Sequence, residues 1–199
     1  MANESALFFG QFLRSPASVG AIAPSSRRLA EQVCVPIPEQ GDPVVVELGP
    51  GTGPFTAEIQ RRLGGRGRHL AVELNPKLAA HLSDRHPGVE VVVDDACGLP
   101  TLLSDRGVAQ ADVIISGLPW AAFSPKLQDS LMKAILGSLN PGGAFTMFAY
   151  VHAMLLPPAL RIRRTLFSSF EEVVMGRTVW PNLPPAFVYH ARRPRKNTF

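Results

Sequence analysis

Residues 45–53 read Val-Val-Glu-Leu-Gly-Pro-Gly-Thr-Gly, an apolar stretch that ends in a glycine-rich turn. The apolar run begins at Val44 and carries one carboxylate, Glu47, near its end. Glycines let a backbone bend sharply and approach a ligand closely. Pro54 follows the turn directly, and proline suits the first turn of a helix. The stretch therefore predicts a strand, a ligand-binding turn and a helix in succession.

The spacing of the glycines limits which ligand the turn can hold. Gly49, Gly51 and Gly53 form a Gly-x-Gly-x-Gly pattern, whereas a dinucleotide site needs a third glycine where this chain has Pro54. A pyrophosphate also binds free amides at a helix start, and proline has no N–H. The turn therefore disfavours nicotinamide and flavin dinucleotides and favours a nucleoside cofactor without phosphates.

Strands and helices alternate along the rest of the chain. Further strands rich in Val and Ile are expected at residues 69–73, 89–93, 112–115 and, after a turn at 141–143, 144–151. Helices are expected at 54–63, 76–82, 126–139 and 159–170. Strands that are apolar on both faces indicate a parallel sheet covered by helices. Two later strands, 172–179 and 186–192, are expected to pair antiparallel, so the fold class is α/β with a mostly parallel sheet and an antiparallel edge.

The first 36 residues predict a helical extension ahead of this domain. In residues 5–14 an apolar face combines three phenylalanines with a leucine: Phe8, Phe9, Phe12 and Leu13. A second helix is expected at 27–33, capped by Ser25 or Ser26. We therefore divide the chain into an extension, 1–36, that acts as a membrane anchor or cofactor lid, and a catalytic domain, 37–199.

Composition excludes several classes of protein. A chain of 199 residues with 46% hydrophobic residues can bury a core as one domain. No apolar run approaches the roughly 20 residues that span a bilayer, and the N-terminus has no signal-peptide pattern. Cys34 and Cys97 are too far apart for a disulfide framework or zinc-ligand spacing, so we expect no metal. The expected compartment is the cytoplasm.

Charge is distributed unevenly along the chain. Residues 1–150 carry 12 basic and 14 acidic side chains, whereas residues 151–199 carry 8 and 2. A basic surface of this kind favours an anionic partner, either a phospholipid leaflet or a nucleic acid. The alternative is a solvated basic tail without a specific partner.

Two acidic residues follow predicted strands in the order that a nucleoside requires. Glu73 ends the second strand, where a carboxylate can accept hydrogen bonds from both ribose hydroxyls. Asp95 follows the third strand and can accept from an adenine amino group, while the Ala96 amide can donate to a ring nitrogen. Because ligands of open α/β sheets bind at the carboxyl ends of the strands, these residues predict a cofactor site.

Together these motifs resemble those of the class I S-adenosylmethionine-dependent methyltransferases. The resemblance implies a Rossmann-like methyltransferase sheet and S-adenosylmethionine as cofactor. It also implies that the glycine turn holds the methionine part, while Glu73 holds the ribose and Asp95 the adenine. Glu47 is expected to form a hydrogen bond near the amino-acid moiety.

The loop after the fourth strand resembles two methyltransferase families. Residues 116–120, Ser-Gly-Leu-Pro-Trp, are similar to the Asn-Leu-Pro-Tyr motif of ribosomal RNA adenine dimethylases, with Gly117 in place of the asparagine and Trp120 in place of the tyrosine. The backbone carbonyls of Gly117 and Leu118 remain as acceptor-site groups. Bacterial phospholipid N-methyltransferases are resembled at residues 12–16, 19–26, 116–119 and 182–186. That second resemblance implies stepwise methylation of phosphatidylethanolamine toward phosphatidylcholine.

Methyl transfer to an amine also requires a proton acceptor. A primary amine of pKa ~10.4 is mostly protonated at neutral pH and must lose a proton before it attacks. Tyr150 and His152, at the end of the fifth strand, are candidate relays, or His152 is simply structural. Trp120 and Tyr150 are candidates to hold a methylated ammonium by cation–π contact, or both are core aromatics.

Three functions remain open at this point. We expect N-methylation of a phospholipid head-group amine by a peripheral enzyme on the inner membrane face, with an anionic phospholipid surface as partner. The alternatives are ribosomal RNA adenine N6-methylation and a non-catalytic membrane- or RNA-binding module. We expect no obligate protein partner. Phe8, Phe9, Phe12 and Leu13 are expected to insert at the membrane interface.

Overall fold

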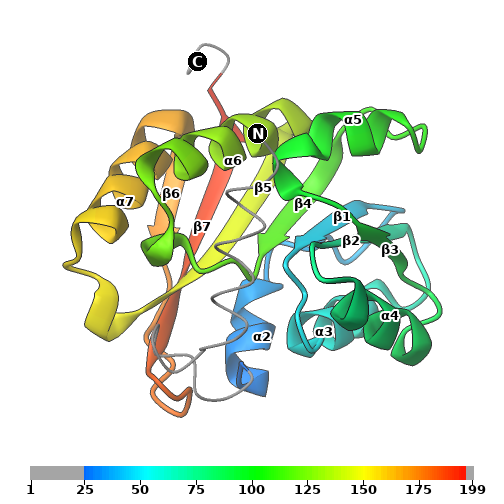
Figure 1. Ribbon diagram of the computed structural model, residues 1–199, viewed down its shortest axis with the longest axis horizontal. Coiled ribbons are helices and arrows are strands. Elements are labelled where there is room, and N and C mark those ends of the chain that lie inside the picture. The colour runs from blue at the N-terminus through cyan, green and yellow to red at the C-terminus, as the bar shows by residue number, and fades with distance from the viewer. Residues whose placement is uncertain (1–24, 196–199) are drawn as a thin grey trace.

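The computed structural model describes residues 25–195, which form a seven-stranded sheet with helices on both faces (Figure 1). The strands are β1 (Val44–Leu48), β2 (Arg68–Glu73), β3 (Glu90–Val93), β4 (Ala111–Ser116), β5 (Leu139–Tyr150), β6 (Phe170–Met175) and β7 (Ala186–Pro194). Their order is β3-β2-β1-β4-β5-β7-β6. Neighbours among β1 to β5 are parallel, and β7 is antiparallel to both β5 and β6. The predicted mostly parallel sheet with an antiparallel edge is confirmed.

Alternating burial along the strands builds one core on each face of the sheet. Val46 of β1 belongs to the larger core with α5 (Leu99–Ser104), α6 (Pro125–Ser138) and α7 (Pro157–Ser169). Its neighbour Val45 faces the other core, with α2 (Arg27–Val33) and α3 (Pro54–Leu63). The helix α4 (Pro76–Arg85) lies on that same side, against Ala71 of β2 (Figure 1). This arrangement leaves the carboxyl ends of the parallel strands at one edge of the sheet.

The helix α2 is part of the domain core. The Ser26 hydroxyl caps it by accepting a hydrogen bond from the Leu29 amide at 3.2 Å. The Ser26 amide donates to Oδ1 of Asn182 at 2.9 Å, so the cap is also joined to the loop before β7. Leu29, Ala30 and Val33 are buried. The described part of the predicted extension therefore packs as a layer of the domain, while its first 24 residues, including the expected apolar face at 5–14, lie outside the described residues.

The structure differs from the sequence-based expectation at β5. The turn expected at 141–143 lies within β5, which begins at Leu139. Ala111 pairs with Leu139 and Val113 with Ala144, so extra residues bulge out of β5 between these pairs. Asp112 stabilises this bulge, because its carboxylate accepts hydrogen bonds from the Asn140 side chain at 2.6 Å and from the Val44 amide at 2.8 Å.

Two further features concern helices. The helix α5 was not predicted, because it has only six residues. The sequence signal for it is the spacing of the buried residues Leu99, Leu102 and Leu103. Within α3, Arg62 and Glu58, four residues apart, form an ion pair at 2.9 Å. Within residues 25–195, none of the helices combines the length and apolarity needed to cross a membrane.

Candidate functional site

The candidate site lies where the turns after β1 and β4 meet. These strands are adjacent, and the chain leaves them toward opposite sides of the sheet, which creates a crevice at their carboxyl ends. The Gly117 amide donates to the Leu48 carbonyl at 2.8 Å. A Cβ atom on Gly117 would lie 2.5 Å from the Gly49 carbonyl oxygen. Position 117 therefore has no room for a side chain unless the backbone of one turn shifts.

The glycine turn is built from left-handed residues. Gly49, Gly51 and Gly53 have φ angles of 68°, 59° and 87°, which other residues rarely adopt. The Gly53 amide donates to the Pro50 carbonyl at 3.0 Å, and α3 begins at Pro54 as predicted. A compact turn without side chains thus presents backbone groups at the end of β1.

Glu73 joins the end of β2 to this turn. Its side chain is fully buried, and its two oxygens accept from the Gly51 amide at 3.1 Å and the Asn75 amide at 2.9 Å. Burial raises the pKa of the carboxyl group, and the two backbone N–H groups partly oppose that rise. Each carboxylate oxygen can accept more than one hydrogen bond, so ribose hydroxyls could still bind here.

Asp95 and Ala96 line a small pocket at the carboxyl ends of β1 to β4. The Asp95 carboxylate accepts from the Cys97 amide at 2.9 Å and thereby caps a short 3₁₀ turn. The pocket is lined by Gly49, Val72, Leu74, Asp94, Asp95, Ala96, Leu118, Phe123, Leu127 and Leu131. Four predicted site residues therefore share one cavity: Gly49, Asp95, Ala96 and Leu118.

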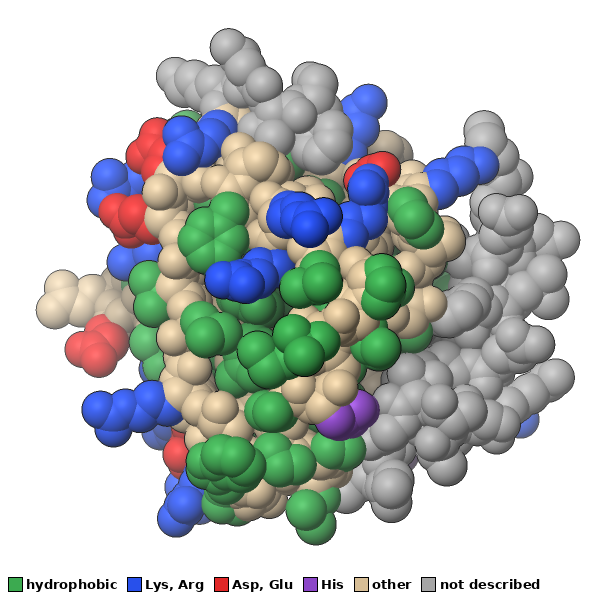
Figure 2. All heavy atoms as spheres, turned by 90° about the vertical axis from the view of Figure 1, so that its left-hand side faces the viewer, with side chains coloured by type: hydrophobic (Ala, Val, Ile, Leu, Met, Phe, Trp, Pro, Cys, Tyr) green, Lys and Arg blue, Asp and Glu red, His purple; other side chains and the backbone are tan. Residues whose placement is uncertain are grey.

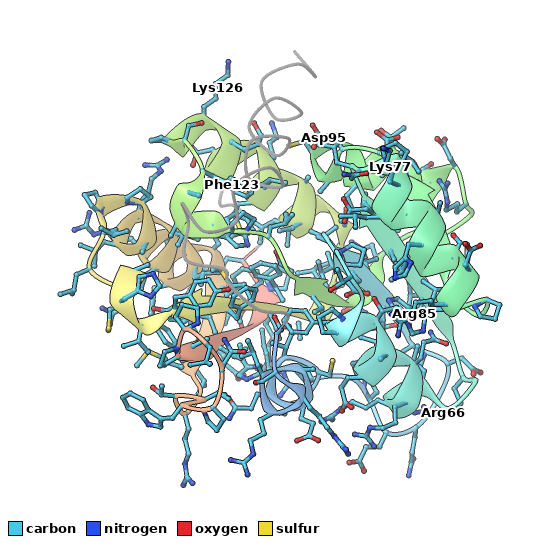
Figure 3. All side chains as sticks on the ribbon, turned by 60° about the horizontal axis from the view of Figure 1, so that its bottom comes forward. Arg66, Lys77, Arg85, Asp95, Phe123 and Lys126 are labelled. Carbon is cyan, nitrogen blue, oxygen red and sulfur yellow. The ribbon has the colours of Figure 1, made fainter. Side chains whose placement is uncertain are left out.

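The apolar walls of the pocket include two residues that sequence reasoning missed. Leu74 directly follows Glu73, and Phe123 lies three residues after Trp120. Figure 3 shows Asp95 and Phe123 in the same part of the molecule, apart from Arg85 and Arg66. The sequence signal for Leu74 is its position, because an apolar residue directly after a ribose-binding acid is placed to contact the base.

Glu47 lies behind the glycine turn, between α3 and β2. Its carboxylate is fully buried and accepts from the Thr56 hydroxyl at 2.7 Å. The same oxygen lies 3.2 Å from Nε2 of His69, whose Nδ1 is 3.0 Å from the Gln60 amide nitrogen. The second oxygen, Oε1, has no hydrogen-bond partner among the described residues. Glu47 therefore supports the glycine turn through its contacts with α3 and β2, and its Oε1 atom remains available to accept a hydrogen bond.

Trp120 is a core aromatic, which is the second of the two roles considered for it. Its side chain is only 2% exposed, and its indole N–H donates to the Ser116 hydroxyl at 2.9 Å. The ring packs edge-to-face on Phe145 at 5.9 Å. The Gln128 amide donates to the Trp120 carbonyl at 2.8 Å. These contacts fix the position of the loop between β4 and α6, residues 117–124, which we call the acceptor loop. They also leave the Trp120 ring without an open face for a cation.

Tyr150 and His152 lie at the end of β5, one strand away from Gly117 and Leu118. Tyr150 is half-buried, and burial raises the pKa of its phenol. Its ring packs edge-to-face on Phe148 at 5.3 Å and stacks on the exposed His152 ring at 5.6 Å. The sheet thus places both proposed relays at the same edge as the acceptor loop.

Comparison with known proteins identifies the family of this chain. Residues 45–143 match the family model of a methyltransferase domain. An ornithine lipid N-methyltransferase from Singulisphaera acidiphila is 34% identical over 94% of each chain. A ribosomal RNA small subunit methyltransferase A from a Burkholderia species is 35% identical over 60% of this chain and 40% of its own. TrmN from Thermus thermophilus shares the fold with a TM-score of 0.67, at 20% identity over 91% of this chain and 53% of its own. The chain therefore belongs to the class I S-adenosylmethionine-dependent methyltransferases.

Proposed function

We propose that this enzyme methylates an amine nitrogen in the head group of a membrane lipid, acting as a peripheral protein at the cytoplasmic membrane face. The observation that carries the proposal is the match to a lipid N-methyltransferase over 94% of both chains. The matched ribosomal RNA methyltransferase aligns over only 40% of its own length. Phosphatidylethanolamine is the acceptor that the sequence motifs favour, and ornithine lipid is the acceptor named for the relative.

The residues present fit S-adenosylmethionine as cofactor. Glu73 offers a buried carboxylate for the ribose hydroxyls, and Asp95 and Ala96 line the adjoining pocket. Leu74 and Leu118 supply apolar walls for the adenine. The unpartnered oxygen of Glu47 lies behind the turn that would hold the amino-acid moiety. When bound, the cofactor supplies an electrophilic methyl group on a sulfonium.

The acceptor residues must position a neutral amine and remove its proton. The carbonyls of Gly117 and Leu118 lie directly after β4, beside the cofactor pocket that Leu118 lines. The Leu118 carbonyl already accepts from the Trp120 amide at 3.0 Å, but each carbonyl oxygen has two lone pairs, so both can accept a hydrogen bond from the amine. The raised pKa of Tyr150 keeps its phenol protonated at neutral pH, so it serves as a hydrogen-bonding group rather than as a base. The exposed His152, stacked on that ring, is the group able to take up the proton and pass it to solvent.

The space around Gly117 argues against adenine methylation. An adenine dimethylase motif has an asparagine at this position, and its side chain would hold the exocyclic amine of a flipped base. Here a Cβ atom would lie 2.5 Å from a backbone carbonyl, so the loop has a different packing. A non-catalytic module is also disfavoured, because the glycine turn, Glu73 and Asp95 are all present and assembled at one sheet edge.

The experiment is a product assay with labelled S-adenosylmethionine. The enzyme is incubated separately with phosphatidylethanolamine vesicles, with ornithine lipid and with ribosomal RNA. Thin-layer chromatography of the lipids and filter binding of the RNA report the label. We expect label in at least one lipid fraction, its loss in Glu73→Ala, and its retention in Glu90→Ala, which removes an exposed carboxylate of β3. Label in RNA alone would overturn the proposed substrate.

A further inference from the structure

We propose that a hydrophobic face at the β6 edge docks the enzyme on an anionic lipid bilayer. This docking face consists of exposed side chains from the loop before α7, from α7 and β6, and from the β6–β7 turn: Leu155, Leu156, Phe167, Met175, Trp180 and Leu183. The inference rests on the proposed lipid substrate. It goes beyond that function, because it assigns the membrane contact to a particular surface of the catalytic domain.

Exposed apolar side chains are concentrated in one stretch of the chain. Of the ten large hydrophobic residues that are exposed within 25–195, eight fall between residues 154 and 183. Leu155, Trp180 and Leu183 are 77%, 69% and 67% exposed. A soluble surface rarely carries so many large apolar groups together, so such a patch marks an interaction site.

Tertiary structure brings these segments together. The Val151 amide donates to the Pro185 carbonyl at 2.9 Å, which joins the loop before α7 to the β6–β7 turn. The helix α7 and the strand β6 pack side by side within the larger core. Figure 2 shows hydrophobic side chains gathered over this face of the molecule, with Lys and Arg side chains around them. The segments therefore form one surface rather than scattered exposures.

The charges beside the docking face identify an anionic bilayer as its occupant. Arg163, Arg164 and Arg177 are exposed and form no ion pair within residues 25–195. The Arg163 guanidinium lies 5.7 Å from the centre of the Phe167 ring, so apolar and cationic groups alternate at short range. A long cationic side chain can follow an apolar surface while its head group meets lipid phosphates.

The acidic residues of this region are already paired. Arg193 contacts Glu172 at 2.7 Å and Glu171 at 3.9 Å, and Arg161 contacts Asp129 at 2.6 Å. Two arginines face three carboxylates in these pairs, so one negative charge remains, and the unpaired Arg163, Arg164 and Arg177 outweigh it. The remaining field beside the docking face is therefore positive.

The position of the docking face also suits the proposed reaction. The loop that carries Leu155 follows the end of β5, where Tyr150 and His152 lie. A bilayer that contacts this loop would hold its head groups beside the proposed acceptor residues. Tryptophan is favoured at membrane–water interfaces, and Trp180 lies at the tip of the neighbouring turn.

Vesicle binding by the full chain tests the proposal without requiring methyl transfer. The probe is sedimentation with phosphatidylcholine vesicles that contain phosphatidylglycerol, neither of which has a primary amine. We expect Leu155→Glu/Trp180→Glu to weaken binding by about 10-fold or more, equivalent to ~1.4 kcal/mol. The matched control is Val35→Glu, because Val35 is 58% exposed and follows the C-terminal end of α2, on the face of the sheet opposite α7.

The electrostatic part has its own pair of variants. Arg163→Gln/Arg164→Gln should weaken binding by about fivefold per arginine at low salt, and the loss should shrink as salt is added. Arg85→Gln is the control, since Arg85 is exposed on α4 and lies far from α7 in Figure 3. All variants should retain wild-type turnover on a short-chain lipid dissolved as monomers, because none changes the cofactor or acceptor residues.

Three possible results decide whether the docking face binds the bilayer. Wild-type vesicle binding by Leu155→Glu/Trp180→Glu, or an equal loss in Val35→Glu, would overturn the docking face. A dimer that this double variant dissolves, with vesicle binding unchanged, would assign the face to a second copy of the chain and also overturn the proposal. Specific loss of vesicle binding would support it, even if the wild-type enzyme methylates no lipid, in which case only the proposed function fails.

Discussion

The cofactor half and the acceptor half of the sheet hold their functional groups in different ways. In the cofactor half, β1 to β3, the carboxylates of Glu73 and Asp95 accept from backbone amides, two of which lie only two residues along the chain. In the acceptor half, β4 to β7, Trp120 and Tyr150 are held by aromatic packing that spans distant segments. A cofactor shared by a whole class can be bound by short local motifs, whereas an acceptor site depends on how the rest of the domain packs.

The largest expected effect tests the cofactor half. Glu73→Ala removes the buried carboxylate and leaves the amides of Gly51 and Asn75 without their acceptor. Affinity for S-adenosylmethionine should fall by about 1.5–3 kcal/mol, or roughly 10- to 150-fold. Titration calorimetry measures the loss, and Glu90→Ala should bind as the wild type does. Unchanged affinity in Glu73→Ala would remove this residue from the site.

The second-largest effect is expected at Gly117, where the turns of the two halves meet. Gly117→Ala places a Cβ atom 2.5 Å from the Gly49 carbonyl oxygen and forces one turn to move. We expect a loss of about 1–3 kcal/mol in stability together with weaker cofactor binding and slower methyl transfer. Gly137→Ala in α6 is the control, because its nearest contact is an ordinary 3.8 Å. That helical substitution should be neutral or stabilising, by up to ~1 kcal/mol. Equal behaviour of the two variants in thermal unfolding and turnover assays would contradict the tight contact between the turns.

The third effect is a pH dependence confined to the cofactor half. Burial raises the pKa of Glu73 above its ordinary value of 4.5. The ionised form is the stronger acceptor for ribose, so affinity should fall as pH drops through the raised pKa, by up to about 10-fold per unit below it. The same shift favours folding of the apo protein at low pH, and this contribution is lost as pH rises through the folded-state pKa. Binding curves between pH 4.5 and 8 should show the dependence in the wild type and a flatter profile in Glu73→Gln. Identical profiles would mean that another group controls binding.

The smallest effect on cofactor binding is expected in the acceptor half, for a substitution that lowers stability. Ser116→Ala leaves the buried indole N–H of Trp120 and the Leu118 amide without this acceptor, and it should lower the free energy of unfolding by about 1–3 kcal/mol. Ser138→Ala is the control, because the buried Ser138 hydroxyl has no partner in the described chain, and its removal should cost little. Urea denaturation compares the two variants. Cofactor affinity should stay within about twofold in both, since neither substitution changes a side chain that lines the pocket. A cofactor defect in Ser116→Ala would show that the two halves are coupled through this hydrogen bond.

The sequence predicts the cofactor half more completely than the acceptor half. The strand before Gly49, the helix beginning at Pro54 and the carboxylates at strand ends follow from local pattern, and the structure places them accordingly. The parallel topology follows as well, because apolar strands alternate with helices. These features depend on residues close together in the chain.

Other features could not be read from local pattern. The burial of Trp120 depends on Phe145, which lies 25 residues later, and the early start of β5 depends on the Asp112–Asn140 hydrogen bond. The docking face is a similar case, because its exposed leucines and tryptophan have the composition of a core segment. Their exposure depends on where the fold places the loop before α7 and the β6–β7 turn.

The strand order has a consequence for how the chain is made. Because β7 lies between β5 and β6, the earlier of these strands emerges from the ribosome with an open edge, and β6 has no neighbour until residues 186–194 have followed. Both edges stay available to other chains during that interval. The cofactor half can close around β1, β2 and β3 much sooner. Synthesis therefore completes the two halves at different times, and the interval before β7 pairs is when the nascent protein is most prone to aggregation.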